Sequence, residues 1–416
     1  MDYQKIRLNN ATLHIFKTKK FKKISINVLF TDFINETNMS YRTLLARTME
    51  SKSLKYDTKQ KINRKLDMLY GASFGISSSK NGKTTYINAS IDGVNPKYVG
   101  DDKLLDDYFL FLHDMIFNPI FDKKNVSEEK RLLFDDYNAE YENKAVYAAI
   151  RCSEIAFSDE LARLKFNGDK KIVEKITGSE LKDYYKYVLE NNKVDIIVLG
   201  DVSDNVVDIA KKYFDIGKNN NYNPIDYEDK VIKKALYVKE EAKSMQSQLM
   251  IKYRTKTRKG DSDHIKMVVA NTIFGGFSSS LLFSNVREKA SLAYSISSTN
   301  AIYKGCITVS AGIKMENYEK TLNLINEQLE NMKKGNFPNE LVEMAKLSII
   351  SSIKKGSDSL GSIARQIYIS ELLDEKFDLY DYIDEVSNIS KDDIIYAINK
   401  LELDVVYFLE GSECDD

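Results

Sequence analysis

The segment from Asn271 to Ser298 holds the two side chains best suited to contacting another molecule. Arg287 presents a planar guanidinium with five donors, and Tyr294, seven residues later, presents a phenolic donor. Before them, Gly275-Gly276 predicts a tight turn, and Ser278–Ser280 offer hydroxyls that can cap the next helix. These residues alone leave a structural alternative open, in which Arg287 pairs with a neighbouring acid and Tyr294 packs at the start of a strand.

Length and composition exclude several classes of protein. The chain has 416 residues, which predicts two or more domains of about 200 residues each. Lys plus Arg number 61 against 62 for Asp plus Glu, so no net charge attracts nucleic acid or an acidic membrane. There is no apolar run of about 18 residues and no signal-peptide core. Cys152, Cys306 and Cys414 are scattered and form no disulfide or zinc-ribbon pattern. We expect a soluble, cytoplasmic protein.

The first half of the chain predicts an alternation of strands and amphipathic helices. Lys23–Thr31 alternates apolar and polar residues like a half-buried strand, and Ser40 opens a helix with one apolar stripe. Asn81-Gly82 marks a hairpin between two strand-like runs. One long helix is predicted from Ser127 to roughly Ser158.

The second half repeats this order, which predicts an internal duplication. Thr177-x-x-Glu180 is a capping box before the strand Val194–Val202, and Ser390-x-x-Asp393 is the same device before the strand Asp404–Leu409. Matching elements are separated by roughly 210 to 225 residues, too far apart for a solenoid repeat. We expect a domain at 1–216, a linker at 217–245 and a second domain at 246–416. Each should be α+β, with an antiparallel-dominated sheet and helices packed on one face.

The context GGFSSSLLF…VREKASLAY resembles the second-half signature of the insulinase/pitrilysin family of zinc peptidases, which includes the mitochondrial processing peptidases. The resemblance covers nearly the whole chain and implies the same two-domain architecture. In that family an Arg and a Tyr at this spacing hold the substrate backbone beside the zinc, which implies a substrate-binding role for Arg287 and Tyr294. Two positions depart from the signature. Leu281 stands where the family usually has Arg, and Ser291 where it usually has Gly.

The zinc motif of the family is degenerate in this chain. Active members carry H-x-x-E-H on the first helix, where the two His bind zinc and the Glu activates a water. The flanking sequences place Thr43, Ala46 and Arg47 at these positions. Acidic residues remain near the position of the third ligand: Asp135, Asp136 and Glu140. The three histidines, His14, His113 and His264, are far apart in sequence, and no H-x-x-E-H occurs. We therefore expect no catalytic residue, no metal ligand and no cofactor in this chain.

Several insulinase-like peptidases are heterodimers, in which a zinc-less subunit contributes the Arg/Tyr pair to a zinc-bearing sister. The resemblance implies such a role here: a non-catalytic, substrate-positioning subunit whose partners are a zinc-bearing sister and a peptide. This chain is also similar to short bacterial zinc-less members of the family, some of which are associated, with a zinc-bearing sister, with aminopentanol modification of elongation factor P. Two alternatives stay open, an active zinc metalloendopeptidase with an atypical site and a peptide-binding scaffold without peptidase activity.

Overall fold

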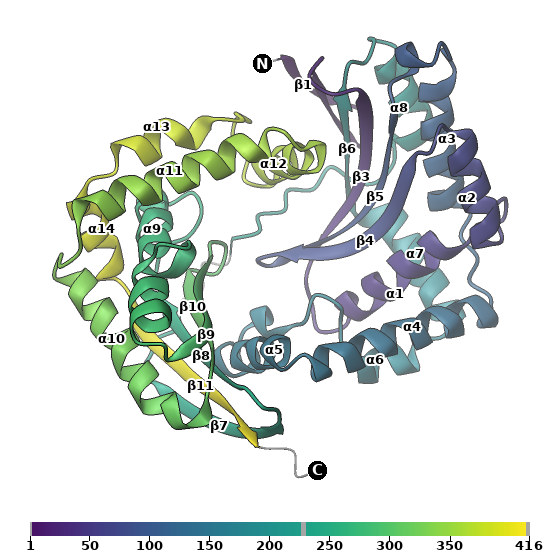
Figure 1. The fold of residues 1–416 in the computed structure, drawn as a ribbon. Helices are drawn as coiled ribbons and strands as arrows, with labels where there is room; N and C mark the ends of the chain where they lie inside the picture. The colour runs from purple at the N-terminus through teal and green to yellow at the C-terminus, as the bar shows by residue number, and fades with distance from the viewer. Residues whose placement is uncertain (1, 226–229, 413–416) are drawn as a thin grey trace. The chain divides into compact units, whose positions relative to one another are not determined.

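The computed structural model describes residues 2–225 and 230–412. The chain forms two compact units (Figure 1). Unit 1 contains the residues up to Tyr137, Leu164–Pro224 and Asp358–Phe377, and unit 2 contains Asn138–Arg163, Ile225–Ser357 and the residues from Asp378 onward. Cys414 and part of the predicted linker lie outside the described residues. Within the described parts of the chain, no helix is both long enough and apolar enough to span a membrane.

Unit 1 is built on a six-stranded mixed sheet of order β1-β2-β6-β3-β5-β4. Its strands are β1 Asp2–Arg7, β2 Thr12–Lys17, β3 Lys23–Phe33, β4 Ser73–Asn81, β5 Thr84–Val94 and β6 Lys193–Gly200. Its helices are α1 Asn38–Ser51, α2 Lys59–Met68, α3 Leu104–Phe117, most of α4 Lys123–Glu142, α6 Lys170–Lys175, α7 Gly178–Asn191, α8 Val206–Phe214 and α12 Leu360–Leu372.

Unit 2 is built on a five-stranded mixed sheet of order β7-β11-β8-β10-β9. Its strands are β7 Leu236–Lys243, β8 Ser247–Arg254, β9 Ala293–Ala301, β10 Cys306–Ile313 and β11 Glu402–Ser412. Its helices are α5 Lys144–Ala156, α9 His264–Asn271, α10 Tyr318–Lys333, α11 Asn339–Gly356, α13 Asp381–Asn388 and α14 Lys391–Ile398. Two π-helical segments, η3 Thr272–Gly276 and η4 Phe283–Lys289, lie between α9 and β9.

The two sheets share one topology, which agrees with the predicted duplication. In unit 1, β2 pairs with β6 in parallel and β6, β3, β5 and β4 follow as antiparallel neighbours. In unit 2, β7, β11, β8, β10 and β9 repeat this pattern, again with a single parallel pair at the start. Strand β7 is the counterpart of β2, so the second repeat includes residues that the sequence places in the predicted linker. The predicted fold class is confirmed, with sheets that are mixed rather than purely antiparallel.

Alternation along the strands separates an apolar face from a polar one in unit 1. On β3, Ile26, Val28 and Phe30 join the hydrophobic core that contains residues of α1, α3, α7 and α8. Ser25 and Asn27 point to the opposite face and are also buried. The prediction of a half-buried strand is therefore wrong in this respect, because β3 is covered on both faces.

A single helix packs on the second face of each sheet, and the two sequence halves exchange these helices. Helix α12 comes from the second half of the chain and packs on β6 and β3 of unit 1. Helix α5 comes from the first half and packs on β11 and β8 of unit 2, where its blue colour contrasts with the green and yellow strands (Figure 1). The expectation of helices on one face alone missed this layer.

Helix α5 is held to the sheet of unit 2 by a buried ion network. The guanidinium of Arg254 on β8 donates to Asp404 of β11 at 2.7 Å, to Glu160 at 2.7 Å and to the carbonyl of Ala156 at 2.8 Å. Lys304 binds Glu160 from the other side at 3.0 Å. Burial alone would raise the pKa of Glu160, but Arg254 and Lys304 hold it below its ordinary value. The carboxylates of Glu160 and Asp404 near the end of α5 are therefore each paired with a cation.

The predicted long helix at 127–158 is wrong in one respect, because the structure has two helices there. Helix α4 ends at Glu142, and Asn143 caps α5 by accepting a hydrogen bond from the backbone N–H of Val146 at 3.2 Å. Asn in a non-helical conformation satisfies the free donors of a new helix and so ends the old one. The hairpin and both predicted capping boxes are confirmed.

Arg254→Met should destabilise unit 2 strongly, because it leaves Asp404 and Glu160 buried without their main cation. Removing one partner of a buried ion pair costs about 3–5 kcal/mol. Urea unfolding followed by circular dichroism measures this loss. Arg131→Met is a matched control, since Arg131 pairs with Asp135 on an exposed helix surface and should cost less than about 1 kcal/mol. Equal losses in both variants would contradict the structural role given to Arg254.

Candidate functional site

The three degenerate motif positions lie on one face of α1 and are all occupied by side chains that do not bind zinc. Thr43 Oγ1 lies 3.0 Å from Ser78 Oγ and donates to the carbonyl of Phe166 at 3.2 Å. Ala46 is buried and offers no ligand atom. Arg47 lies one turn after Thr43 and is half-buried. The helix geometry that the family uses is kept, while the donor atoms are absent.

Arg47 forms an ion pair with Asp136 of α4. Asp136 is one of the acids that the sequence places near the third-ligand position, so the structure brings the last motif position, Arg47, and that acid together. A guanidinium does not lose its proton at physiological pH, and it neutralises the carboxylate that a cation would need. The residues at this position therefore do not fit a zinc ion.

Two glutamates beside this ion pair, the exposed Glu50 and the buried Glu129, were not predicted from the sequence. Glu50 follows Arg47 by one turn of α1, and Glu129 lies on α4 with 4% of its surface exposed. Desolvation by the surrounding protein raises the pKa of Glu50, with a further contribution from the Glu129 carboxylate, and burial raises the pKa of Glu129. Arg47 and Lys59 oppose both shifts. The only sequence signal was the i, i+3 spacing of Arg47 and Glu50, which puts them on one helix face.

Arg287 and Tyr294 are both exposed, in unit 2. Arg287 lies on η4 with its guanidinium over the ring of Phe283, 4.7 Å from the ring centre. Tyr294 is the second residue of β9 and is 59% exposed. Within residues 2–225 and 230–412, neither side chain makes a hydrogen bond or ion pair. Among the described residues Arg287 does not pair with Glu288, and Tyr294 is more exposed than a residue packed at a strand start would be.

The turn before Tyr294 shows why a glycine suits the position that Ser291 occupies. Ser291 has φ of +52°, a left-handed conformation that costs a residue with a side chain about 1–2 kcal/mol. The Gly that the family usually has there would adopt it freely. Gly275-Gly276, in contrast, forms no tight turn, because both residues lie in η3. Gly275 is needed for packing: a Cβ there would lie 2.7 Å from Ser298 Oγ.

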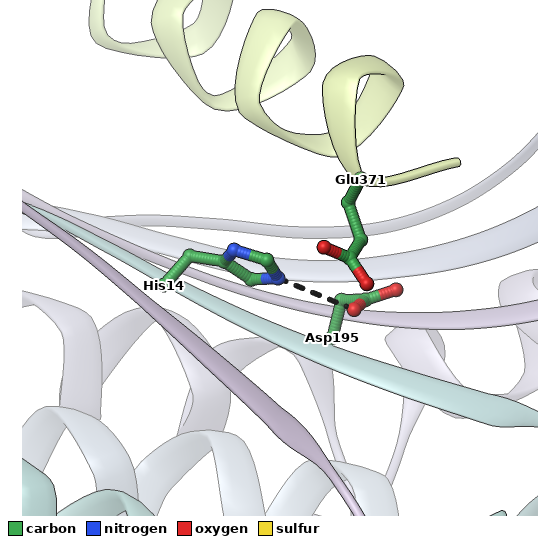
Figure 2. A group of neighbouring side chains, drawn as sticks. All are labelled: His14, Asp195 and Glu371. Atoms are coloured by element: carbon green, nitrogen blue, oxygen red, sulfur yellow. Dashed lines mark hydrogen bonds and ion pairs between the residues drawn. The ribbon is translucent and has the colours of Figure 1, made fainter. Parts of the chain in front are cut away.

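A second set of potential metal ligands lies in unit 1, on the face of the sheet that α12 covers. Figure 2 shows His14 of β2, Asp195 of β6 and Glu371 at the end of α12 gathered together. His14 Nε2 lies 3.3 Å from Asp195 Oδ1, and a hydrogen bond of 2.9 Å joins His14 Nδ1 to the hydroxyl of Tyr3. Burial would raise the pKa of Asp195, but Lys193 and His14 hold it below its ordinary value.

Lys193 occupies the centre of this cluster. Its ammonium donates to both oxygens of Asp195, at 2.7 and 2.9 Å, and to Glu371 at 2.9 Å, while Lys5 binds Glu371 at 2.6 Å. The two carboxylates are thus neutralised by two lysines, and a divalent cation would have to displace one of them. The cluster is the counterpart of the network around Asp404, and it holds α12 on the sheet.

Comparisons with known proteins agree with this geometry. Residues 175–349 match the family model described as the peptidase M16 inactive domain. The chain is 31% identical to the probable inactive metalloprotease YmfF of Bacillus subtilis, over 98% of both chains. Among solved structures, a conserved protein from Enterococcus faecalis V583 aligns with a TM-score of 0.92 and 30% identity over 100% of both chains. A peptidase M16 inactive domain from Pseudomonas fluorescens, with 17% identity and a TM-score of 0.82 over 100% of both chains, shares the fold.

A double variant, Thr43→His with Arg47→His, should acquire a zinc site. It places two imidazoles at i and i+4 on α1 and frees Asp136 to act as the third ligand. We expect about one zinc per chain after dialysis, measured by plasma mass spectrometry, and substoichiometric zinc in the unmodified protein. Adding Asp136→Ala should remove the gain. Zinc bound equally by the unmodified chain would contradict the assignment of these positions as metal-free.

Glu129→Gln should stabilise the fold at neutral pH. The folded-state pKa of Glu129 lies above its ordinary value of 4.5, so the folded state disfavours the carboxylate. This penalty is present above the folded-state pKa and disappears as the pH falls below 4.5, where the carboxyl is protonated in both states. Unfolding free energies at pH 7.5 and about pH 4 should therefore differ between the two proteins only at the higher pH. Glu128→Gln, whose carboxylate is exposed and bound to Lys52, is the control and should show no such gain.

Proposed function

Since the chain belongs to the M16, or insulinase, family of peptidases as one of its inactive members, we propose that it is the substrate-positioning subunit of a divided zinc peptidase. Its partner in this proposal is a sister subunit that carries the zinc motif. The observation that carries the proposal is the state of Arg287 and Tyr294, which are exposed and without polar partners in the described chain while the zinc positions have lost their ligands.

The edge strand β9 supports a peptide as the ligand. Strand β9 is the last strand in the order of its sheet and pairs only with β10 among the described strands. An extended peptide can add to such an edge through main-chain hydrogen bonds. Tyr294 lies on this strand and Arg287 on the preceding π-helical segment, so both donors flank the start of the edge.

In the proposed complex, Arg287 and Tyr294 donate hydrogen bonds to a carbonyl of the bound peptide. A charged donor and a phenol orient that carbonyl and stabilise negative charge that develops on its oxygen. The zinc-bound water and the general base come from the sister subunit. This chain then contributes binding and orientation without chemistry of its own.

The combined variant Arg287→Ala and Tyr294→Phe tests the proposal in an assay of an unstructured peptide mixture with the sister subunit added. A hydrogen bond from a charged group is worth about 1.5–3 kcal/mol, so kcat/KM should fall by roughly ten- to a hundredfold. Co-elution of the two subunits in size-exclusion chromatography should be unchanged, because the substituted side chains are assigned to the peptide.

Arg64→Ala with Tyr70→Phe is the matched control, since both residues are exposed in unit 1. It should leave cleavage unaffected. Full activity of the Arg287 and Tyr294 variant would rule out the substrate-positioning role and favour a scaffold. Cleavage by the unmodified chain alone, with bound zinc, would show that it is self-sufficient.

A further inference from the structure

A cavity of about 620 Å³ opens in unit 1 beside the His14–Asp195–Glu371 cluster. It is lined by the edge strand β1, by the C-terminal end of α12 and by residues 221–223. Its volume lies within the range of about 300–1,000 Å³ that is typical of small-molecule sites. The cavity belongs to unit 1, whereas Arg287 and Tyr294 belong to unit 2.

The side chains at the base, or floor, of this cavity are charged, but their positive and negative charges cancel one another. Lys193 and Glu371 line it, with Asp195 beneath them, and Lys5 completes the set from β1. Two lysines balance two carboxylates, and all three donors of the Lys193 ammonium are used. The floor therefore favours neither a bare anion nor a bare cation.

Two opposite charges on the cavity wall lack partners in the described chain. Arg7 lies two residues after Lys5 on β1, so both side chains leave the strand on the same side. Asp374 follows the end of α12 with φ of +54°. Neither side chain makes an ion pair or hydrogen bond within the parts of the chain that are described. The C-terminal end of α12 adds partial negative charge on the side of Asp374.

We propose that this cavity binds a short peptide with free termini, a zwitterion whose carboxylate meets Arg7 and whose ammonium meets Asp374. The guanidinium fork suits a carboxylate, and an acid beside a helix C-terminus suits an ammonium. The neutral floor carries no surplus charge that would oppose either end. A divalent cation fits less well, because Lys193 holds the carboxylates it would need.

Isothermal titration calorimetry with trialanine, N-acetyl-trialanine and trialanine amide tests the proposal on the full chain. Trialanine should bind, and each blocked form should bind at least about tenfold more weakly, since one charge pair is lost. Sodium acetate and inorganic phosphate serve as probes for a simple anion site. Absence of heat with trialanine at millimolar concentration, or acetate or phosphate binding as tightly as trialanine, would overturn the proposal.

Two exposed substitutions separate the roles of the termini. Arg7→Gln should abolish the preference for trialanine over its amide, while the preference over the acetylated form remains. Asp374→Asn should do the reverse, and Asn tolerates the left-handed backbone at this position. Arg64→Gln, an exposed arginine on α2, should change neither preference. Unchanged preferences in the Arg7 and Asp374 variants, with unchanged thermal melting, would place the peptide elsewhere.

Discussion

A buried aspartate at the start of the closing strand of each repeat determines how this protein is assembled. Asp195 of β6 and Asp404 of β11 lie in nearly dry surroundings, where an unpaired carboxylate would be very costly. Each is neutralised by a cation that also binds a glutamate near the end of the helix on the second face of the sheet, Lys193 with Glu371 and Arg254 with Glu160. A lysine in one network and an arginine in the other have the same effect: Lys193 attaches α12 to its sheet, and Arg254 attaches α5.

This attachment explains why the halves of the sequence and the compact units do not coincide. Each half of the sequence contributes one helix, α5 or α12, to the second face of the other unit's sheet, so the chain passes from one unit to the other several times. The face of the sheet on which α12 or α5 packs needs polar groups at the point where the helix ends. A purely apolar face would accept an amphipathic helix in any register. Serines, asparagines and the aspartate network on that face make the docking position specific.

The ion pair of Arg47 and Asp136 shows how a metal position can be lost without loss of the fold. A zinc ion with ligands from both α1 and α4 would link these two helices. Here a guanidinium and a carboxylate link the same two helices directly. Of the nearby glutamates, Glu129 is buried and Glu50 is more exposed, and desolvation raises the pKa of both. The helix pair keeps its electrostatic contact without the donor atoms of the zinc motif.

The sequence by itself determined the local elements and the repeat, because these depend on short-range patterns. The capping boxes at Thr177 and Ser390, the hairpin at Asn81-Gly82 and the α+β class are read directly from spacing and residue type. The absence of H-x-x-E-H also needs no structure. Tertiary structure alone decided the exchange of α5 and α12, the break at Asn143 and the contact of Arg47 with Asp136. These features join residues that are distant in sequence, or they depend on which face of a strand is covered. The hydrophobic periodicity of a short segment contains neither kind of information.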